Sequence, residues 1–210
     1  QTNGKTNGEV YKVKPGNSKY VDVNKDGVYN DADQGIIGCG QPTFNWGWNN
    51  TFNYKNFDFS FFVVGFHGFD IYNATHQMGY NLIKSQQMAG VTPMRELLNR
   101  WTPTNTNTDI PGFVKGGTEN KDFFSTRFVE NGSFIKMKSI TLGYTLPEAT
   151  CRSLGINNLR VYASVQNPFH ITKYSGLDPE ATMGSPLVQG VDWGAYPNSR
   201  NYLIGLNFSF

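Results

Sequence analysis

The sequence predicts an all-β protein whose strands form part of a large antiparallel transmembrane β-barrel. Five segments alternate apolar and polar residues with a period of two, which is typical of strands with two different faces. The polar faces consist of Asn, Ser, Thr and Gly, and charged residues make up only 16% of the chain, whereas soluble domains contain about a quarter. Aromatic residues reach 15% and gather near strand ends, as an interfacial girdle does.

Composition also excludes several classes of protein. The formal net charge is +2 and no basic cluster is present, which argues against a nucleic-acid partner. The chain contains no run of 18 apolar residues, so it encodes no transmembrane helix. The first residues, 1–4, are neither an initiator methionine nor a signal peptide, so we expect the 210 residues to be a piece of a longer protein.

The first two predicted strands form a hairpin over residues 43–66. Residues 43–54 place aromatic side chains on one face and Asn, Thr and Gly on the other, and residues 57–66 repeat that alternation. Only Lys55 and Asn56 separate the two segments, which predicts a tight turn.

Three further strands are predicted in the second half of the chain. Two of them lie within residues 134–167, over 134–146 and 159–167, and the last occupies residues 200–210. Each predicted strand has close to the ~9–11 residues that a tilted strand needs to cross a bilayer.

The connections alternate in length, as an outer-membrane barrel requires. Those at 55–56 and 147–157 are short, and we expect them on the periplasmic side, with one helical turn at 148–154 ended by Gly155. Residues 1–42, 67–133 and 168–199 are long, and we expect them to be extracellular loops.

A β-sandwich is the alternative, because its strands also alternate. In that case the protein would be a secreted, calcium-stabilised domain that binds carbohydrate. A barrel, for its part, cannot be closed by five strands, since bacterial barrels begin at eight. The barrel prediction therefore requires strands from outside these residues.

The final strand is similar to the signal that barrel-assembly machinery reads at the end of outer-membrane proteins. Gly205, Phe208 and Phe210 supply a glycine and alternating aromatic residues, and Leu203 departs from the pattern, which usually has a polar residue there.

In order along nearly the whole chain, ten motifs and the terminal strand resemble the C-terminal part of SusC/RagA-type TonB-dependent transporters. The motifs are YVDVNKDG (20–27), TFNWGWNNT (43–51), YKNFDFSFF (54–62), DIYNA (70–74), RWTP (100–103), RFVENG (127–132), ITLGYTLP (140–147), NLRVY (158–162), QNPF (166–169) and YSGLDPE (174–180).

This resemblance implies a 22-stranded barrel filled by an N-terminal plug, in the outer membrane of a Gram-negative bacterium. It implies a SusD-like surface lipoprotein as partner, energy from the TonB complex, and import of oligosaccharides or peptides without catalysis.

One loop has the spacing of a calcium-binding motif. Side-chain ligands are expected from Asp22, Asn24, Asp26 and Asp33, at loop positions 1, 3, 5 and 12, and a backbone carbonyl from Val28 at position 7. Such oxygen ligands suit Ca²⁺, or Mg²⁺ in the same place, in a structural role. A solvated turn rich in Asp and Asn is the alternative.

No catalytic arrangement appears, and the protein is expected not to be an enzyme. The histidines (His67, His76 and His170) are expected in loops without partners. Cys39 and Cys151 are expected at opposite ends of the barrel, and therefore unpaired.

No residue is assigned to substrate binding. The long connections contain nine aromatic residues that suit sugar stacking, peptide contacts, docking of the lipoprotein, or packing between loops: Phe66, Phe69, Tyr72, Tyr80, Trp101, Phe113, Tyr174, Trp193 and Tyr196.

Overall fold

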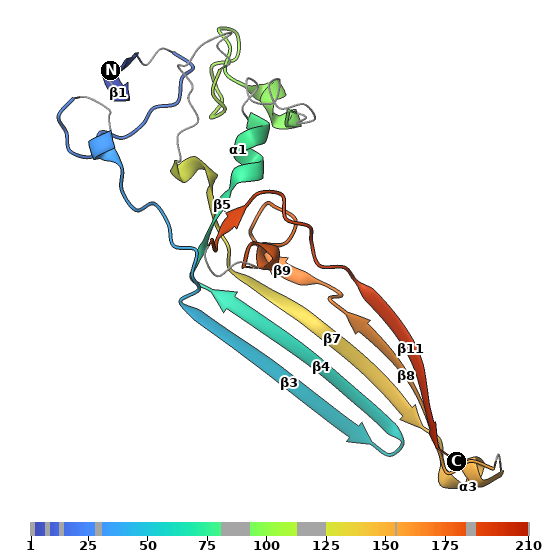
Figure 1. Ribbon diagram of the computed structural model, residues 1–210. Helices are drawn as coiled ribbons and strands as arrows, with labels where there is room; N and C mark the ends of the chain where they lie inside the picture. The colour runs from blue at the N-terminus through green and yellow to red at the C-terminus, as the bar shows by residue number, and fades with distance from the viewer. Residues whose placement is uncertain are drawn as a thin grey trace. The chain divides into compact units, whose positions relative to one another are not determined.

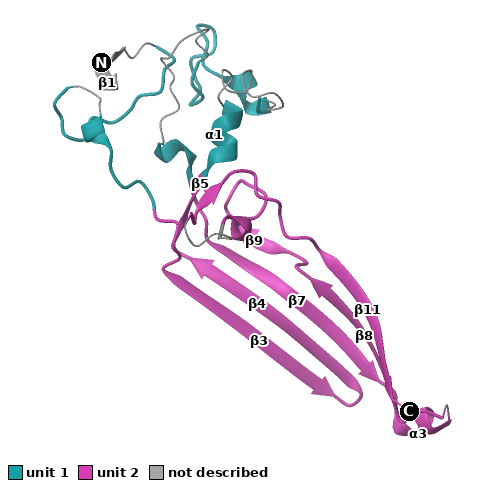
Figure 2. Ribbon diagram, in the orientation of Figure 1, with its two compact units in different colours: residues 1–38, 73–129 teal, residues 39–72, 130–210 magenta. Residues whose placement is uncertain are grey.

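The computed structural model describes residues 3–6, 9–12, 15–27, 31–80, 93–112, 125–153, 155–183 and 188–209. The chain divides into two compact units (Figure 2). The first consists of residues 1–38 and 73–129, and the second of residues 39–72 and 130–210. Within the described residues, every helix is too short or too polar to span a membrane.

Five long antiparallel strands form the main sheet of the second unit (Figure 1). They confirm the five strands predicted from the alternating pattern, with ends that differ by one or two residues. Their order across the sheet is β11-β8-β7-β4-β3, so β3 and β11 are its edges. The short strand β9 (His170–Thr172) also pairs with β7. The long strands are β3 (Phe44–Tyr54), β4 (Phe57–His67), β7 (Phe134–Thr145), β8 (Asn158–Gln166) and β11 (Asn201–Ser209).

The two short connections lie at the same end of this sheet, which we call the short-turn end. Lys55 and Asn56 join β3 to β4 as predicted, and Lys55 adopts a positive φ of 52°. Asn56 also donates its side-chain amide to the carbonyl of Thr145 at 2.7 Å, which ties the turn to β7.

The second short connection contains the predicted helical turn, α3 (Glu148–Ser153). Gly155 follows it with a φ of 73°, and the N–H of Ile156 donates to the carbonyl of Cys151 at 3.1 Å. This is how a glycine in the left-handed region ends a helix. Leu154 and Phe210 lie outside the described residues.

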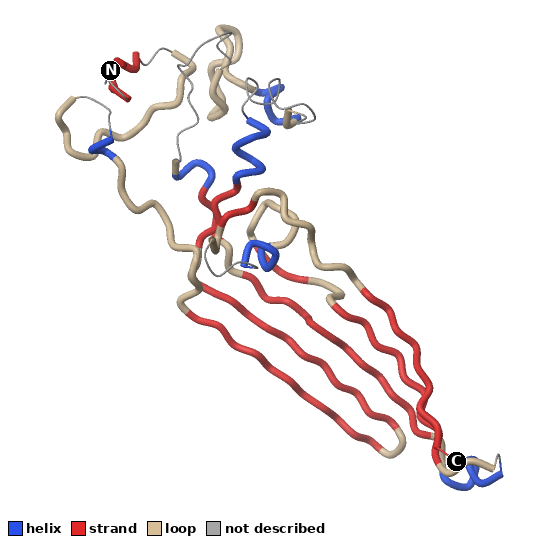
Figure 3. The backbone as a smooth tube through the Cα atoms, in the orientation of Figure 1, coloured by secondary structure: helices blue, strands red, loops and turns tan. Residues whose placement is uncertain are grey.

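The long connections leave from the opposite end, the long-loop end, and they are not simple loops as expected. Three short strands within them form a second sheet of order β10-β5-β6 (Figure 3). They are β5 (Asp70–Asn73), β6 (Val129–Asn131) and β10 (Val191–Asp192). A small core of Phe69, Ile71, Phe134 and Tyr174 is buried here. Strands of two to four residues are too short to display a period in the sequence.

Among its described residues, the first unit contains short elements only. A two-stranded hairpin pairs β1 (Asn3–Thr6) with β2 (Glu9–Lys12). The helical elements are η1 (Asp31–Asp33), α1 (Ala74–Tyr80), η2 (Arg95–Asn99) and η3 (Thr126–Phe128), while η4 (Pro179–Met183) belongs to the second unit.

Candidate functional site: the two faces of the sheet and its long-loop end

One face of the main sheet is apolar and exposed. The register aligns apolar side chains in rows that cross all five strands, and one row contains Phe52, Phe59, Leu142, Ala163 and Ile204. Phe52, Leu142 and Ile204 are 54%, 50% and 86% exposed. A contiguous apolar surface of this kind marks contact with a membrane or another protein.

The opposite face is lined mainly with polar and small residues, although Phe62, Val64 and Leu203 also lie on it. One row across the five strands contains Asn53, Asp58, Gly143, Tyr162 and Gly205, and the next contains Thr51, Ser60, Thr141, Ser164 and Leu203. The hydroxyls of Thr141 and Ser164 are 2.8 Å apart and hydrogen-bonded. The alternation predicted from the sequence therefore separates the two faces as expected.

An ion pair crosses this polar face. Arg160 on β8 donates to both carboxylate oxygens of Asp58 on β4, at 2.9 and 2.5 Å, passing over the intervening strand β7. Gly143 makes the crossing possible, because a Cβ at this position would meet both side chains. The Arg160 guanidinium also lies 5.0 Å from the ring centre of Tyr162, whose ring covers Gly205.

Aromatic residues gather at both ends of the apolar face. At the long-loop end, the indole N–H of Trp46 donates to His67 at 3.1 Å, and Phe44 stacks on the same imidazole. At the short-turn end, the rings of Phe57 and Tyr144 are 4.6 Å apart. This placement fits the predicted interfacial girdle, in which amphipathic rings mark the borders of the hydrocarbon layer.

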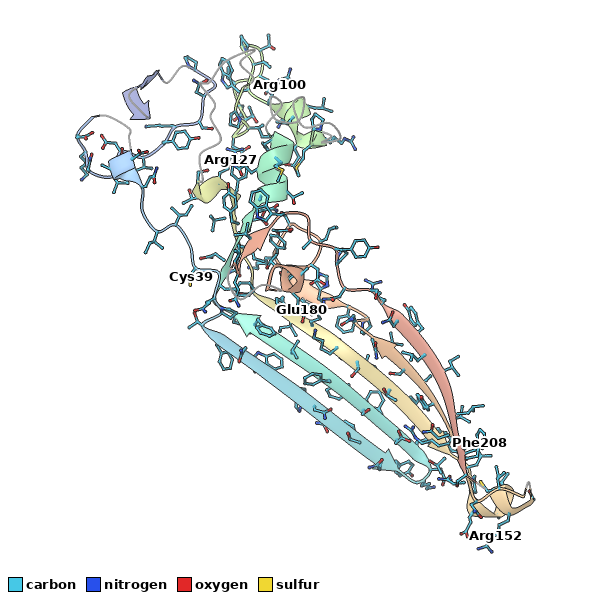
Figure 4. The ribbon with its side chains drawn as sticks, viewed as in Figure 1. Cys39, Arg100, Arg127, Arg152, Glu180 and Phe208 are labelled. Atoms are coloured by element: carbon cyan, nitrogen blue, oxygen red, sulfur yellow. The ribbon has the colours of Figure 1, made fainter. Side chains whose placement is uncertain are left out.

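A buried charge cluster fastens the connection 168–199 to β7. Lys136 is 2% exposed and donates to Asp178 at 2.8 Å and to Glu180 at 2.7 Å. Lys138 also contacts Glu180, which lies near the start of β7 (Figure 4). Asn198 adds a backbone bond of 3.1 Å to Asp178 and a side-chain bond of 2.9 Å to Glu180.

Electrostatics keep both carboxylates of this cluster ionised. Burial raises the pKa of Asp178 and of Glu180, but the hydrogen bonds and positive charge of Lys136 lower these pKa values by more. The net pKa of each carboxyl therefore lies below its ordinary value. Sequence alternation could not reveal the cluster, because its lysine and its carboxylates lie on different elements.

A second fastening lies in the same connection. The buried hydroxyl of Tyr174 donates to Asp192 at 2.5 Å, and burial, followed by this carboxylate, raises the pKa of the phenol above its ordinary value. Glu130 accepts bonds from the backbone N–H and the hydroxyl of Ser175, at 2.8 and 2.7 Å.

The loop at residues 22–33 is wound around its own carboxylates. Asp22 accepts the backbone N–H groups of Asp26 and Gly27 at 3.2 and 2.8 Å, and Gly27 has a φ of 82°. Asn24 accepts the N–H of Asp26 at 3.0 Å, and Asp33 accepts that of Val23 at 2.8 Å.

Four of the five expected ligands lie among the described residues of this loop, while Val28 lies outside them. Within the part of the chain that is described, no three Asp, Glu, His or Cys side chains form a group that could hold a metal ion. The three carboxylates of the expected set, Asp22, Asp26 and Asp33, are therefore not gathered into such a group.

The three histidines lie in helices or strands, so the expectation that they occupy irregular loop is wrong. His67 is the last residue of β4, and His170 lies in β9. His76 lies in α1, where it and Tyr80 both contact Glu96. Burial and the Glu96 carboxylate raise the pKa of Tyr80 to about 12. The cysteines, by contrast, are both unpaired as predicted. Cys39 lies at the long-loop end and Cys151 is on α3 (Figure 4).

The aromatic residues of the long connections differ in burial, and Phe66, Tyr80 and Trp101 are half-buried. Phe69, Tyr72 and Tyr174 are buried, so they pack within the protein. Trp193 and Tyr196 are 60% and 90% exposed. Phe113 lies outside the described residues.

Comparison with known proteins finds similar sequences among TonB-dependent receptors. It is 36% identical over 202 residues to TonB-dependent receptor P3 of Formosa agariphila, covering 93% of this chain and 19% of the relative. It is 32% identical over 199 residues to TonB-dependent receptor SusC of Bacteroides thetaiotaomicron, covering 94% and 18%. The chain thus spans about a fifth of the length of these curated relatives. No protein-family model matches.

Solved structures agree with these sequence matches. A chain of the RagAB peptide transporter superposes with a TM-score of 0.68 at 28% identity, over 81% of this chain and 17% of that chain. A chain of the RagAB peptide importer in its closed-closed state superposes with a TM-score of 0.67 at 28% identity, over 81% of this chain and 18% of that chain.

Proposed function

We propose, from the premise that this chain is homologous to SusC/RagA-type TonB-dependent transporters, that it forms five adjoining strands of an outer-membrane nutrient importer. The observation that carries the proposal is the main sheet, with one exposed apolar face and one polar face. The sheet matches solved RagAB chains, and its sequence matches TonB-dependent receptors.

In this proposal the apolar face contacts lipid and the polar face lines the lumen. The remaining strands of a 22-stranded barrel would pair with β3 and β11, and a plug would fill the interior. The long-loop end would be extracellular, where a SusD-like lipoprotein covers the barrel. TonB would supply energy for import of oligosaccharides or peptides, and no bond would be made or broken.

The exposed apolar face argues against the calcium-stabilised, carbohydrate-binding sandwich. In a sandwich, a second sheet packs on that face and buries it. Ile204 on β11 is instead 86% exposed, and Tyr202 is 75% exposed.

A purification tests the import proposal directly. The chain should be tagged in the bacterium that encodes it and extracted from outer membranes. We expect it to require detergent and to co-purify with the rest of a barrel and a lipoprotein. Cells lacking the gene should lose uptake of a labelled oligosaccharide or peptide, as should cells lacking TonB. A water-soluble monomer of 210 residues would contradict the proposal and favour the sandwich.

We also propose that residues 22–33 bind Ca²⁺, or Mg²⁺ in the same place, in a structural role. Asp22, Asn24, Asp26 and Asp33 would supply side-chain oxygens and Val28 a carbonyl. The support is the loop spacing together with the bonds that curl residues 23–27 around the Asp22 carboxylate.

Calcium titration of the full-length protein tests this site. We expect added Ca²⁺ to protect the loop from proteolysis and a chelator to remove that protection. Asp22→Asn should abolish the effect, while Asp31→Asn, which removes the same charge from a non-ligand position, should preserve it. Equal protection with and without Ca²⁺ would contradict the proposal.

A further inference from the structure

The first unit contains a cavity of about 340 Å³ that none of the sites above uses. Three segments that are far apart in the sequence line it: residues 16–21, residues 101 and 108–111, and residues 125–127. Its volume lies at the small end of the range for ligand pockets. Trp101 is one of the aromatic residues singled out in the long connections.

The cavity wall is held together by backbone hydrogen bonds. The N–H of Gly112 donates to the carbonyl of Gly16 at 2.7 Å, and the N–H of Trp101 donates to Ile110 at 2.9 Å. Arg127 donates to the carbonyl of Asp109 at 2.7 Å, which links the third segment to the second. Arg127 is labelled in Figure 4.

Gly16 has a structural reason to be glycine. Its φ is 90°, and a Cβ there would collide with the ring of Trp101. The glycine backbone therefore packs directly on the indole, which fixes the ring that lines the cavity.

An unsatisfied donor lies in the wall. The side-chain nitrogen of Asn17 is buried and has no hydrogen-bond partner. A buried donor without a partner is unfavourable, and native structures rarely leave one unless a ligand or water satisfies it. Because the terminal torsion of Asn is broad, rotation about it can turn this nitrogen toward the cavity that Asn17 lines.

The lining chemistry suits a sugar ring. Ser18, Thr108 and Thr126 carry hydroxyls, which both donate and accept as sugar hydroxyls do. The indole of Trp101 offers a negative face to the weakly positive C–H face of a pyranose. The charged residues are of both signs, with Lys19 and Arg127 opposed by Asp109, so the cavity is not a simple anion site.

An extended peptide fits this wall less well. Peptides in extended conformation bind by adding a strand to an exposed sheet edge. The lining segments contain no strand among their described residues, and the only pairing beside them is the isolated bridge Thr102–Asn105.

We propose that this cavity binds one ring of a saccharide chain, stacked on Trp101 and hydrogen-bonded by Asn17. The proposal rests on the importer function and deepens it, because it names saccharide as the class of cargo that the first unit contacts. The cavity would then be a contact point for the cargo outside the polar face of the sheet.

The test uses the full-length transporter in detergent and measures binding by calorimetry. The probes are linear malto-, xylo- and galacturono-oligosaccharides, and a pooled tryptic digest for comparison. Asn17→Leu keeps the side-chain size and removes the unpartnered amide, so the protein should fold as well as the wild type. We expect at least one saccharide series to bind, with affinity about 3- to 10-fold weaker in Asn17→Leu, as the loss of one hydrogen bond predicts.

Trp101→Ala should weaken the same saccharide by about tenfold or more, because it removes the stacking surface. Leu98→Ala is the control, since this side chain is 79% exposed in the first unit and does not line the cavity, and it should leave affinity unchanged. Binding that Asn17→Leu does not alter would overturn the site, as would the absence of binding by every saccharide series.

Peptide binding that depends on Asn17 and Trp101 would overturn the saccharide class. Uptake measurements on the same variants separate the two proposals. Cells with wild-type transporter that import nothing would contradict the importer function itself. Intact import together with an unchanged saccharide affinity in Asn17→Leu would contradict only this cavity.

Discussion

Lys136 is a buried cation within strand β7 of the main sheet, and its carboxylate partners come from a distant connection. Burial of an isolated ion is very unfavourable, so the lysine is tolerated because Asp178 and Glu180 both bind it. These ion pairs fix where the connection 168–199 contacts β7, because its two carboxylates must reach the ammonium group of Lys136.

Lys136→Met should loosen that connection. The substitution keeps an unbranched side chain but leaves the buried carboxylate of Asp178 without its lysine partner, and breaking a buried pair costs about 3–5 kcal/mol. We expect a lower thermal unfolding midpoint in detergent and faster proteolysis within residues 173–198. Lys138→Met is the control, since Lys138 is 29% exposed, and should have a smaller effect. Equal midpoints for the two variants would show that the buried pair is not what fastens the loop.

Acid should release the same connection. The folded pKa values of Asp178 and Glu180 are depressed, so their contribution is fully present above the unfolded values of about 4 and is lost as pH falls through the folded values. We therefore expect proteolysis within residues 173–198 to accelerate below about pH 4. Lys136→Met should flatten this pH dependence, and a wild-type profile that is already flat would contradict the assignment.

Side-chain alternation could predict which face a residue occupies, but not which distant partner it meets. Asp58 and Arg160 were both assignable to polar faces of strands, while their ion pair depends on the register of three strands. The Asp22–Gly27 turn was predictable because its hydrogen bonds are local. The Lys136 cluster and the Asn17 cavity could not be predicted, since both assemble residues that are far apart in the chain.

At the scale of elements, the long strands were predictable and the short ones were not. Nine or more residues of period-two alternation define a strand and its faces, as β3 and β11 show. The strands β5, β6 and β10 have two to four residues and exist because tertiary hydrogen bonds select them, such as the bond from Tyr72 to Gly190 at 2.7 Å. So few residues display no recognisable period, and the sequence therefore predicts only connections there.

Gly143 on β7 leaves space on the polar face for the ion pair between Asp58 on β4 and Arg160 on β8. Gly143→Val should push apart Asp58 and Arg160, whose side chains occupy the space that a Cβ would need. Overpacking of this kind costs about 1–3 kcal/mol, so the thermal unfolding midpoint of the full-length protein in detergent should fall.

A double-mutant cycle isolates the cause of that loss. In an Asp58→Ala/Arg160→Ala background the pair is absent, and Gly143→Val should then cost much less. The same loss in both backgrounds would place the strain in the backbone of β7 instead of in the ion pair.

At the scale of the whole molecule, the two faces of the sheet should tolerate charge differently. Ala163 and Ser164 are neighbours on β8, with Ala163 on the apolar face and Ser164 on the polar face. Arginine on a lipid-facing strand position costs about 2–4 kcal/mol near the bilayer centre. We expect Ala163→Arg to reduce the amount of folded transporter in outer membranes far more than Ser164→Arg. Equal losses would contradict the assignment of faces.

The edges of the sheet lead to the last prediction. Strands β3 and β11 each have one partner among the described residues, so their outer N–H and C=O groups need further strands. In hydrocarbon each unpaired group costs several kcal/mol, which is why open sheets do not span membranes. The 210 residues expressed alone should therefore fail to insert into liposomes as monomers, and should aggregate through those edges. Co-expression with the remaining segment of a homologous full-length receptor should restore a heat-stable, protease-resistant barrel. A monomer of the isolated chain that inserts and resists protease would mean that its edges are closed within the chain itself.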